Sequence, residues 1–134
     1  MSNIKTTMLG TAAMLLLSLT ASADDVMKKQ ADGTYVVNTT TICKAKGYKS
    51  TTPVEVYIKG GKVVKVVSLP NTEGKGYYAR VEKNLVGKLA GQKVAKAKKM
   101  AEQPKVDGCT GATMSTRAVQ QNVKAALDYY QKHK

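Results

Sequence analysis

The chain has 134 residues, enough for one domain with a modest core, and it is strongly basic, with 22 Lys and Arg against 9 Asp and Glu. Its two cysteines and single histidine, the penultimate residue, do not make a convincing metal site. It also has no Ser-His-acid set and no carboxylate pair at a telling spacing, which argues against a self-contained enzyme.

The first 23 residues have the layout of a signal peptide. A basic start at Lys5 precedes an apolar run from Met8 to Leu19, and the small residues Ala21-Ser22-Ala23 form a cleavage pattern. The run is shorter than the roughly 20 residues that a membrane-spanning helix needs. We therefore expect residues 1–23 to be a signal peptide and residues 24–134 to be a domain exported to the periplasm or cell surface. The alternative is an uncleaved anchor that keeps the domain associated with the membrane.

The excess of positive charge has several interpretations in an exported protein. Nucleic acid would be the first partner to consider in the cytoplasm, but export argues against it. Most lysines are spaced along predicted strands and helices, which is typical of a solvated surface. The alternatives are association with an anionic envelope surface and docking of an acidic redox partner.

The first half of the domain has the pattern of β-structure. Residues 34–45 are rich in β-branched side chains and predict a strand. Residues 54–59 alternate in polarity and predict a half-buried strand, and residues 62–69 predict the next one. Gly60-Gly61 joins these two as a hairpin, because glycine adopts the positive φ that tight hairpin turns need.

The second half changes to helical patterns. Residues 77–90 carry apolar side chains at helical spacing, residues 94–102 are rich in Ala and Lys, and residues 115–132 have an apolar face. Strands followed by helices are typical of an α+β fold. We expect an antiparallel sheet with a central β-hairpin, packed against C-terminal helices.

The segment from Lys105 to Arg117 carries the residues most suited to chemistry. Gly108 and Gly111 allow sharp turns and a close approach of a ligand to the backbone. The segment leads into a helix, whose free N–H groups and dipole favour an anion, and Arg117 adds a positive charge there. A phosphate-sized anion site and an ordinary helix-capping loop both remain open. The hydroxyls that serve either purpose are those of Thr110, Thr113, Ser115 and Thr116.

The same segment resembles the flavinylation motif of the FMN-binding domain family, whose members include subunits of ion-pumping membrane redox complexes and small exported flavoproteins. That motif runs Asp-x-x-Ser/Thr-Gly-Ala/Ser-Thr, and its defined positions match Asp107, Thr110, Gly111, Ala112 and Thr113. In the family the last Thr carries FMN through a phosphoester bond that a magnesium-dependent flavin transferase installs. The resemblance therefore implies covalent FMN on Thr113.

The resemblance covers nearly the whole mature chain and includes a second loop. The stretch from Thr72 to Gly76 resembles the Glu-Thr-Pro-Gly segment that lines the flavin site in the family, with Glu and Thr exchanged and the Pro absent. It implies a loop near the flavin, to which Thr72, Glu73 and Gly74 belong. Gly108 and Ser115 complete the expected cofactor-binding residues.

Cys109 lies inside the motif, four residues before Thr113, and the other cysteine is Cys43. One interpretation is a disulfide that pins the flavin loop to the sheet. The alternative is two small buried hydrophobic residues. A redox-active pair that exchanges electrons with the flavin is a third hypothesis.

These observations predict an exported flavin electron carrier rather than a self-contained enzyme, since nothing in the chain resembles a substrate-activating apparatus. In similar exported proteins the flavin passes electrons between a membrane donor and a terminal reductase outside the cytoplasm. One alternative is a module that binds a flavin or another phosphate ligand without a covalent bond, in a sensory or recruiting role. Another is a cationic envelope-binding protein that has lost its flavin.

Overall fold

Four antiparallel strands lie side by side in chain order within residues 26–109 and 111–134, which the computed structural model describes. They are β2 (Met27–Lys29), β3 (Tyr35–Asn38), β4 (Val54–Lys59) and β5 (Lys62–Ser68). The hairpin predicted between β4 and β5 is confirmed, and Gly60 and Gly61 have φ values of +60° and +77°. The expected signal peptide, residues 1–23, lies outside the described residues.

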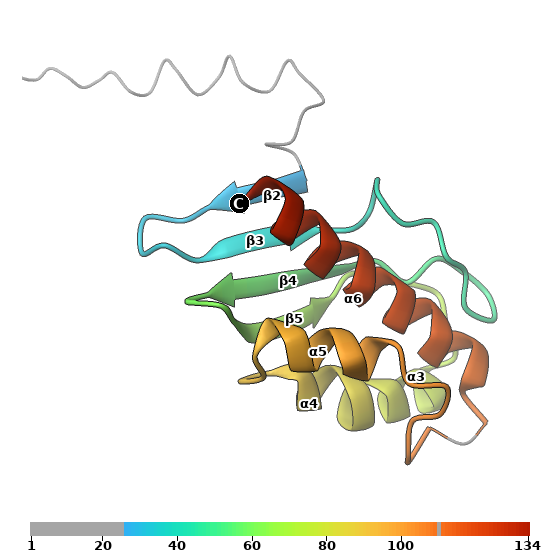
Figure 1. Cartoon of the computed structure of the whole chain (residues 1–134). Coiled ribbons are helices and arrows are strands. Elements are labelled where there is room, and N and C mark those ends of the chain that lie inside the picture. The colour runs from blue at the N-terminus through green and yellow to red at the C-terminus, as the bar shows by residue number, and fades with distance from the viewer. Residues whose placement is uncertain (1–25, 110) are drawn as a thin grey trace, which may run out of the picture.

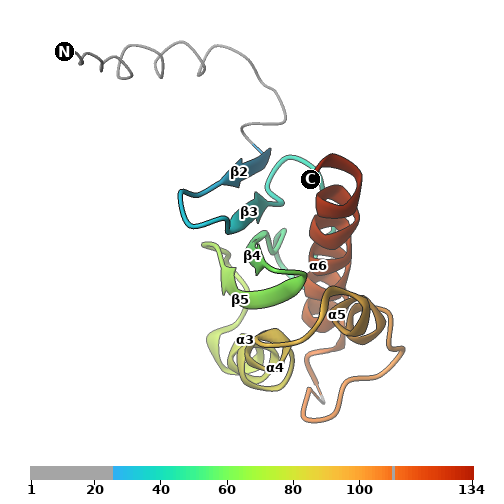
Figure 2. The ribbon, with the colours of Figure 1, turned by 60° about the vertical axis from the view of Figure 1, so that its left-hand side comes forward.

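Helices follow the sheet in the chain and pack on one side of it (Figures 1 and 2). They are α3 (Lys75–Val81), the π-helical turn η1 (Glu82–Val86), α4 (Gly87–Leu89), α5 (Val94–Ala101) and α6 (Thr113–His133). The long helix α6 contacts β3 and β4, whereas η1, α4 and α5 contact β5. The predicted α+β fold is therefore confirmed. Among the described helices, none is long and apolar enough to cross a membrane.

Alternating burial along β4 identifies the face of the sheet that carries the core. Val54, Val56 and Ile58 have no exposed surface, because they face the helices, and this burial of apolar surface drives the packing. Tyr57 lies on the opposite face, where the ammonium group of Lys65 is 4.5 Å from its ring centre. The helices contribute fully buried apolar side chains to the same core from Val81, Leu85, Leu89, Val119, Val123 and Leu127.

The strand predicted over residues 34–45 is too long, because polar groups turn the chain after Asn38. The side-chain oxygen of Asn38 accepts the N–H of Thr40 at 2.8 Å, and the carbonyl of Thr39 accepts the N–H of Cys43 at 3.1 Å. These local hydrogen bonds override the β-propensity of the segment. The strand β2, which was not predicted, has three residues and is too short to show a period.

The helix predicted over residues 77–90 begins at Lys75 and is interrupted by η1. Here the N–H of Gly87 bonds to the carbonyl of Glu82, five residues back instead of four. Such π turns are frequent at functional sites. The last helix was predicted to begin at residue 115 but begins at Thr113, so this threonine lies in the first turn of α6.

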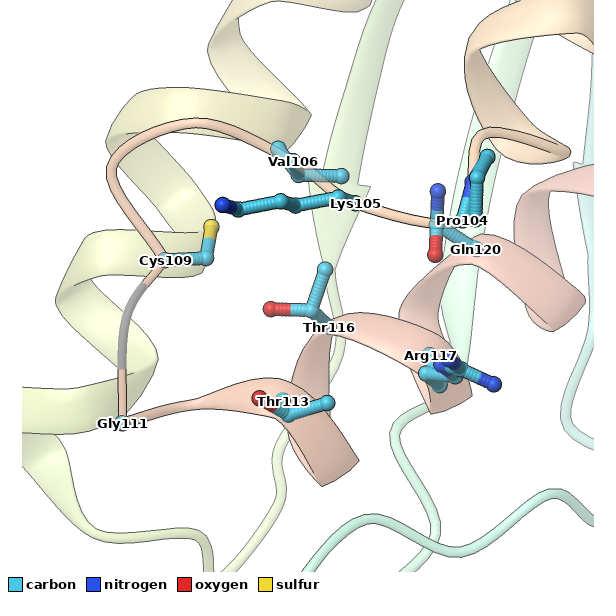
Figure 3. Close-up of a pocket in the computed structure, with 9 residues that line it drawn as sticks. All are labelled: Pro104, Lys105, Val106, Cys109, Gly111, Thr113, Thr116, Arg117 and Gln120. Carbon is cyan, nitrogen blue, oxygen red and sulfur yellow. The ribbon is translucent and has the colours of Figure 1, made fainter.

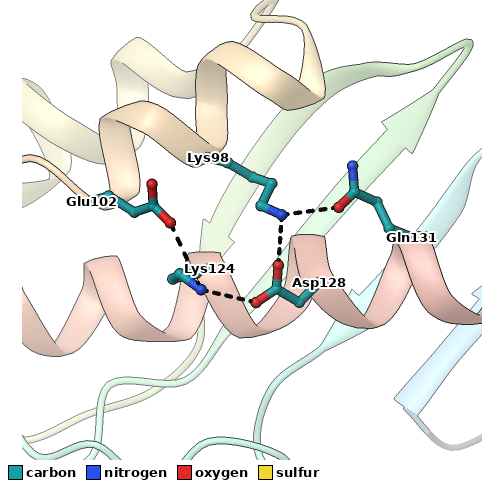
Figure 4. Close-up of polar contacts among 5 residues, drawn as sticks. All are labelled: Lys98, Glu102, Lys124, Asp128 and Gln131. Atoms are coloured by element: carbon teal, nitrogen blue, oxygen red, sulfur yellow. Dashed lines mark hydrogen bonds and ion pairs between the residues drawn. The ribbon is translucent and has the colours of Figure 1, made fainter.

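A charged network joins α5 to α6 (Figure 4). The ammonium group of Lys98 lies 2.8 Å from one Asp128 oxygen, and that of Lys124 lies 3.1 Å from the other and 3.7 Å from Glu102. The hydrogen bond from Lys98 is the main reason that the pKa of Asp128 lies below its ordinary value. Two of the few acidic side chains are therefore paired along this helix contact.

A buried polar bridge links α6 to the sheet. Asn122 has no exposed surface, and its Oδ1 accepts the hydroxyl of Thr39 at 2.6 Å. The Thr39 oxygen in turn accepts the N–H of Val54 at 2.9 Å, where β4 begins. The bridge therefore holds α6 at the end of the sheet where β4 starts.

We predict that Asn122→Ala lowers the free energy of unfolding by about 1–3 kcal/mol, because the Thr39 hydroxyl loses its buried acceptor. Urea unfolding followed by circular dichroism measures the change. Gln121→Ala, at the neighbouring exposed position, is the control and should change stability by less than about 0.5 kcal/mol. Equal losses in the two variants would contradict the bridge.

Candidate functional site

The hydroxyls of the motif segment have different environments. Ser115 and Thr116 are buried, and they donate hydrogen bonds to a Glu73 carboxylate oxygen and to the carbonyl of Ala112, respectively. Thr113 is exposed, and its hydroxyl has no hydrogen-bond partner among the described residues. Thr110 lies outside those residues. Within the described segment, Thr113 thus carries the hydroxyl that is available to a ligand.

The helix start at Thr113 is not a capping loop of the ordinary kind. Its N-cap residue is Ala112, and no side chain within the described part of the chain caps the first turn. The first N–H groups of a helix have no partner inside the helix, and their partial positive charge favours an anion. Of the two interpretations of this segment, the anion site therefore fits the geometry better.

Gly108 and Gly111 both have positive φ, at +86° and +84°, and each also avoids a steric conflict. A methyl group on Gly108 would lie 2.4 Å from the side-chain carbon of Asn84. The Asn84 amide donates to the carbonyls of Gly108 at 3.1 Å and Arg80 at 3.0 Å, so η1 holds the motif loop. A methyl group on Gly111 would lie 3.2 Å from a guanidinium nitrogen of Arg80, which is a tight contact. These are positions where only glycine fits without strain.

The two cysteines are free thiols in the structure. Cys109 is buried, and its thiol lies 3.6 Å from the carbonyl of Arg80, on α3. Cys43 is half-buried in the turn after β3. Because Cys109 packs toward α3, it behaves as the small buried residue of the alternative interpretation.

The carboxylate of Glu73 is buried and takes up hydrogen bonds from two other segments. Its oxygens accept the backbone N–H groups of Tyr48 at 2.8 Å, Lys49 at 2.7 Å and Ser50 at 2.7 Å. One of them also accepts the hydroxyl of Ser115 in the first turn of α6. We call these four hydrogen bonds, with Glu73 and Ser115, the Glu73 clamp.

The clamp changes the interpretation of two predicted site residues. Glu73 and Ser115 were expected to bind the cofactor, but their polar atoms bind each other and the backbone of residues 48–50. Thr72 is exposed, and its N–H donates to the hydroxyl oxygen of Ser50 at 3.1 Å. Glu73 and Gly74 of the 72–74 loop line the same cleft as Thr113.

The clamp also sets the charge state of Glu73. Burial alone would raise the pKa of this carboxyl, but the Ser115 hydroxyl and the backbone N–H groups stabilise its charged form. Together they hold the pKa of Glu73 below its ordinary value of 4.5.

Two clefts meet at Thr113 and Gly111, which line both of them. The first, which we call the basic cleft, has a volume of about 250 Å³ and carries Lys105 and Arg117 (Figure 3). The second, which we call the aromatic cleft, has a volume of about 460 Å³, within the range of small-molecule sites. Its lining includes Tyr48, Tyr77, Met114, Gly74 and Ala112.

The aromatic cleft carries three of the most exposed large apolar side chains of the described residues. Tyr48, Tyr77 and Met114 are 73%, 55% and 54% exposed. Large apolar groups gathered at the surface mark binding sites. Sequence reasoning missed all three, and the only signal was their nearness in the chain to Gly47, Gly74 and the motif.

Asp107 lines neither the basic nor the aromatic cleft. It is exposed and lines a third cleft, with Asn84 and Lys96. No group of three or more His, Cys, Asp or Glu within residues 26–109 and 111–134 could hold a metal ion.

The fold and the site together define a small α+β domain in which the start of α6 lies between a basic and an aromatic cleft. The sequence profile of the FMN-binding domain family matches residues 47–128, well over half of the chain, and both loops of the clamp lie in that range. The chain belongs to this family. No curated protein and no solved structure matches it.

We predict that the Glu73 carboxylate makes stability depend on pH in acid. Because its pKa is lowered in the folded state, its contribution is complete above about pH 4.5 and is lost as the pH falls through the folded-state value. Glu73→Gln should therefore be less stable than the wild type at neutral pH, and the difference should shrink in acid. Urea unfolding at a series of pH values measures this.

Glu82→Gln, which removes an exposed carboxyl from η1, is the matched control. A stability difference between Glu73→Gln and the wild type that stays constant from neutral pH into acid would contradict the role given to the carboxylate.

Proposed function

We propose that this FMN-binding domain is an exported electron carrier whose FMN is esterified through its phosphate to Thr113. One observation carries the proposal: within the described motif segment, Thr113 alone presents an exposed hydroxyl without a hydrogen bond, and it does so where the two clefts meet. Ser115 and Thr116 use theirs inside the fold. The match to the flavinylation motif, which ends at Thr113, supports the same residue.

The basic cleft suits the phosphate end of the cofactor. Lys105 and Arg117 line it beside Thr113, and the uncapped first turn of α6 adds backbone N–H groups. Side-chain cations and helix N-termini are the usual partners of phosphate oxygens. These groups would hold a phosphoester on Thr113 and offset its charge.

The aromatic cleft suits the isoalloxazine ring. FMN, when bound, supplies one- and two-electron transfer, and the protein sets the surroundings of its ring. Tyr48 and Tyr77 offer flat apolar surfaces and Met114 a flexible one, so these side chains would shield the ring from water. Because they are themselves exposed, an edge of the ring would stay within reach of a redox partner.

An electron carrier fits this site better than an enzyme with its own substrate. The clefts carry cations and apolar side chains, and the one carboxylate that lines either of them, Glu73, is occupied by the clamp. We propose a membrane electron donor and an extracytoplasmic reductase as partners, and a flavin transferase that uses magnesium for maturation. Lys49, Lys105 and Arg117 near the clefts suit a partner with an acidic surface, and they also suit an anionic envelope surface.

We predict that protein produced with an active flavin transferase gains about 438 Da, the mass of FMN less water, and stays yellow after denaturation. Thr113→Val should abolish this adduct and keep the fold, since valine has nearly the same shape as threonine. Intact-mass spectrometry measures both.

Thr116→Val is the matched control, because it removes a hydroxyl that the fold already uses, and it should still take up flavin. A yellow protein with an unshifted mass would favour non-covalent binding instead. Colourless wild-type protein, from a transferase that labels another target, would overturn the proposal.

We predict that the charge around the clefts selects for anionic partners. Reduced flavin-loaded protein should give one electron to each ferricyanide ion at a rate that falls with added salt, by about ten-fold or more, because attraction becomes screened. The cation hexaammineruthenium(III) should show the opposite trend. Stopped-flow absorbance measures both rates.

Lys49→Gln and Lys105→Gln should slow the reaction with ferricyanide at low salt. Lys62→Gln, in the hairpin at the opposite end of the sheet, is the control and should have little effect. Identical salt dependence for the two oxidants would contradict an attractive surface for anionic partners.

A further inference from the structure

We propose that Glu73 is a positioning residue for the flavin ring: its clamp fixes Tyr48, one wall of the aromatic cleft, against the start of α6. The inference rests on the proposed attachment of FMN to Thr113 and goes beyond it, because it assigns a cause to the shape of the cleft. The clamp joins three segments that are distant in sequence, the 47–50 loop, the 72–74 loop and the first turn of α6.

The two aromatic walls of the cleft have separate supports. Tyr77 lies on α3, which the hydroxyl of Tyr78 ties to that of Ser68 on β5 at 2.8 Å, and Val81 fixes α3 in the core. Tyr48 is held by the hydrogen bond from its own N–H to Glu73, and its side chain is too exposed to be held by burial. Loss of the clamp would therefore release one wall and leave the other in place.

Gly47 shows how closely the loop is drawn onto the helix. A methyl group there would lie 2.5 Å from a Glu73 oxygen and 3.2 Å from the Cα of Ser115. Gly47 does not have a positive φ, so its backbone conformation does not require glycine. Glycine is required because a side chain would not fit in the space. The backbone before Tyr48 thus packs directly against both partners of the clamp.

A carboxylate suits this role because it accepts several hydrogen bonds at once and has no donor of its own when ionised. Three converging N–H groups fix the loop backbone, and the Ser115 hydroxyl sets its distance from α6. Thr113 and Ser115 lie in the same helical turn. The clamp on Ser115 therefore fixes Tyr48 relative to the attachment point on Thr113. The ring on Thr113 would then meet Tyr48 at a fixed distance.

The test uses the full chain loaded with FMN, with loading checked by intact mass in every sample. Two variants loosen the clamp: Ser115→Ala removes one hydrogen bond without adding bulk, and Gly47→Ala forces the loop from the helix. In the wild type, contact with tyrosine should keep flavin emission low and iodide should quench it weakly. Both variants should show several-fold higher emission and stronger quenching by iodide, while circular dichroism stays unchanged.

Gly76→Ala is the matched control, because it adds the same methyl group on α3, where nothing lies within 4 Å, and it should leave both signals unchanged. Tyr48→Leu should raise emission by itself. Gly47→Ala added to Tyr48→Leu should then have little further effect, because both changes act on one contact. General loosening of the fold would instead give additive effects.

Different results would overturn the positioning role of Glu73 and the attachment of FMN to Thr113. If Ser115→Ala and Gly47→Ala carry FMN and match the wild type in emission and iodide quenching, the positioning role is overturned and attachment to Thr113 stands. Additive effects in the double variant overturn it as well. If the wild type takes up no flavin, both fall together.

Discussion

The buried carboxylate of Glu73 is the interaction on which the arrangement of this site depends. A charged group in a buried position is costly unless hydrogen bonds surround it, and here backbone N–H groups and the Ser115 hydroxyl do so. Because those donors come from different parts of the chain, the charge can be satisfied only when the segments have met. The need to stabilise the Glu73 charge thus fixes how these segments are arranged around the site.

A division of roles among similar side chains makes the helix start useful. Ser115 and Thr116 give their protons to groups inside the fold, so they secure the first turn of α6. Thr113 is left at the surface by the same turn. Among the described residues no side chain caps this helix start, so its first N–H groups are left open to a ligand.

The sequence alone was sufficient for features with a local signal. The β4–β5 hairpin and the apolar face of α6 follow from short-range patterns. The roles of Glu73 and Ser115 could not be predicted, because their partnership joins residues 42 positions apart and leaves no period in the chain. The end of β3 was missed for a different reason: local hydrogen bonds to Asn38 and Thr39 turn the chain there, and propensity scales omit such bonds.

The donors that hold the 47–50 loop have an evolutionary consequence. Main-chain N–H groups are supplied by every residue except proline, so the side chains of Tyr48 and Lys49 carry no part of the anchor. Selection or design could exchange them to alter the colour, potential or partner preference of a bound flavin without rebuilding the loop. Gly47 has no such freedom, because any larger side chain would collide with the anchor itself. A position that must stay glycine, Gly47, is thus followed directly by one whose side chain is free to vary, Tyr48.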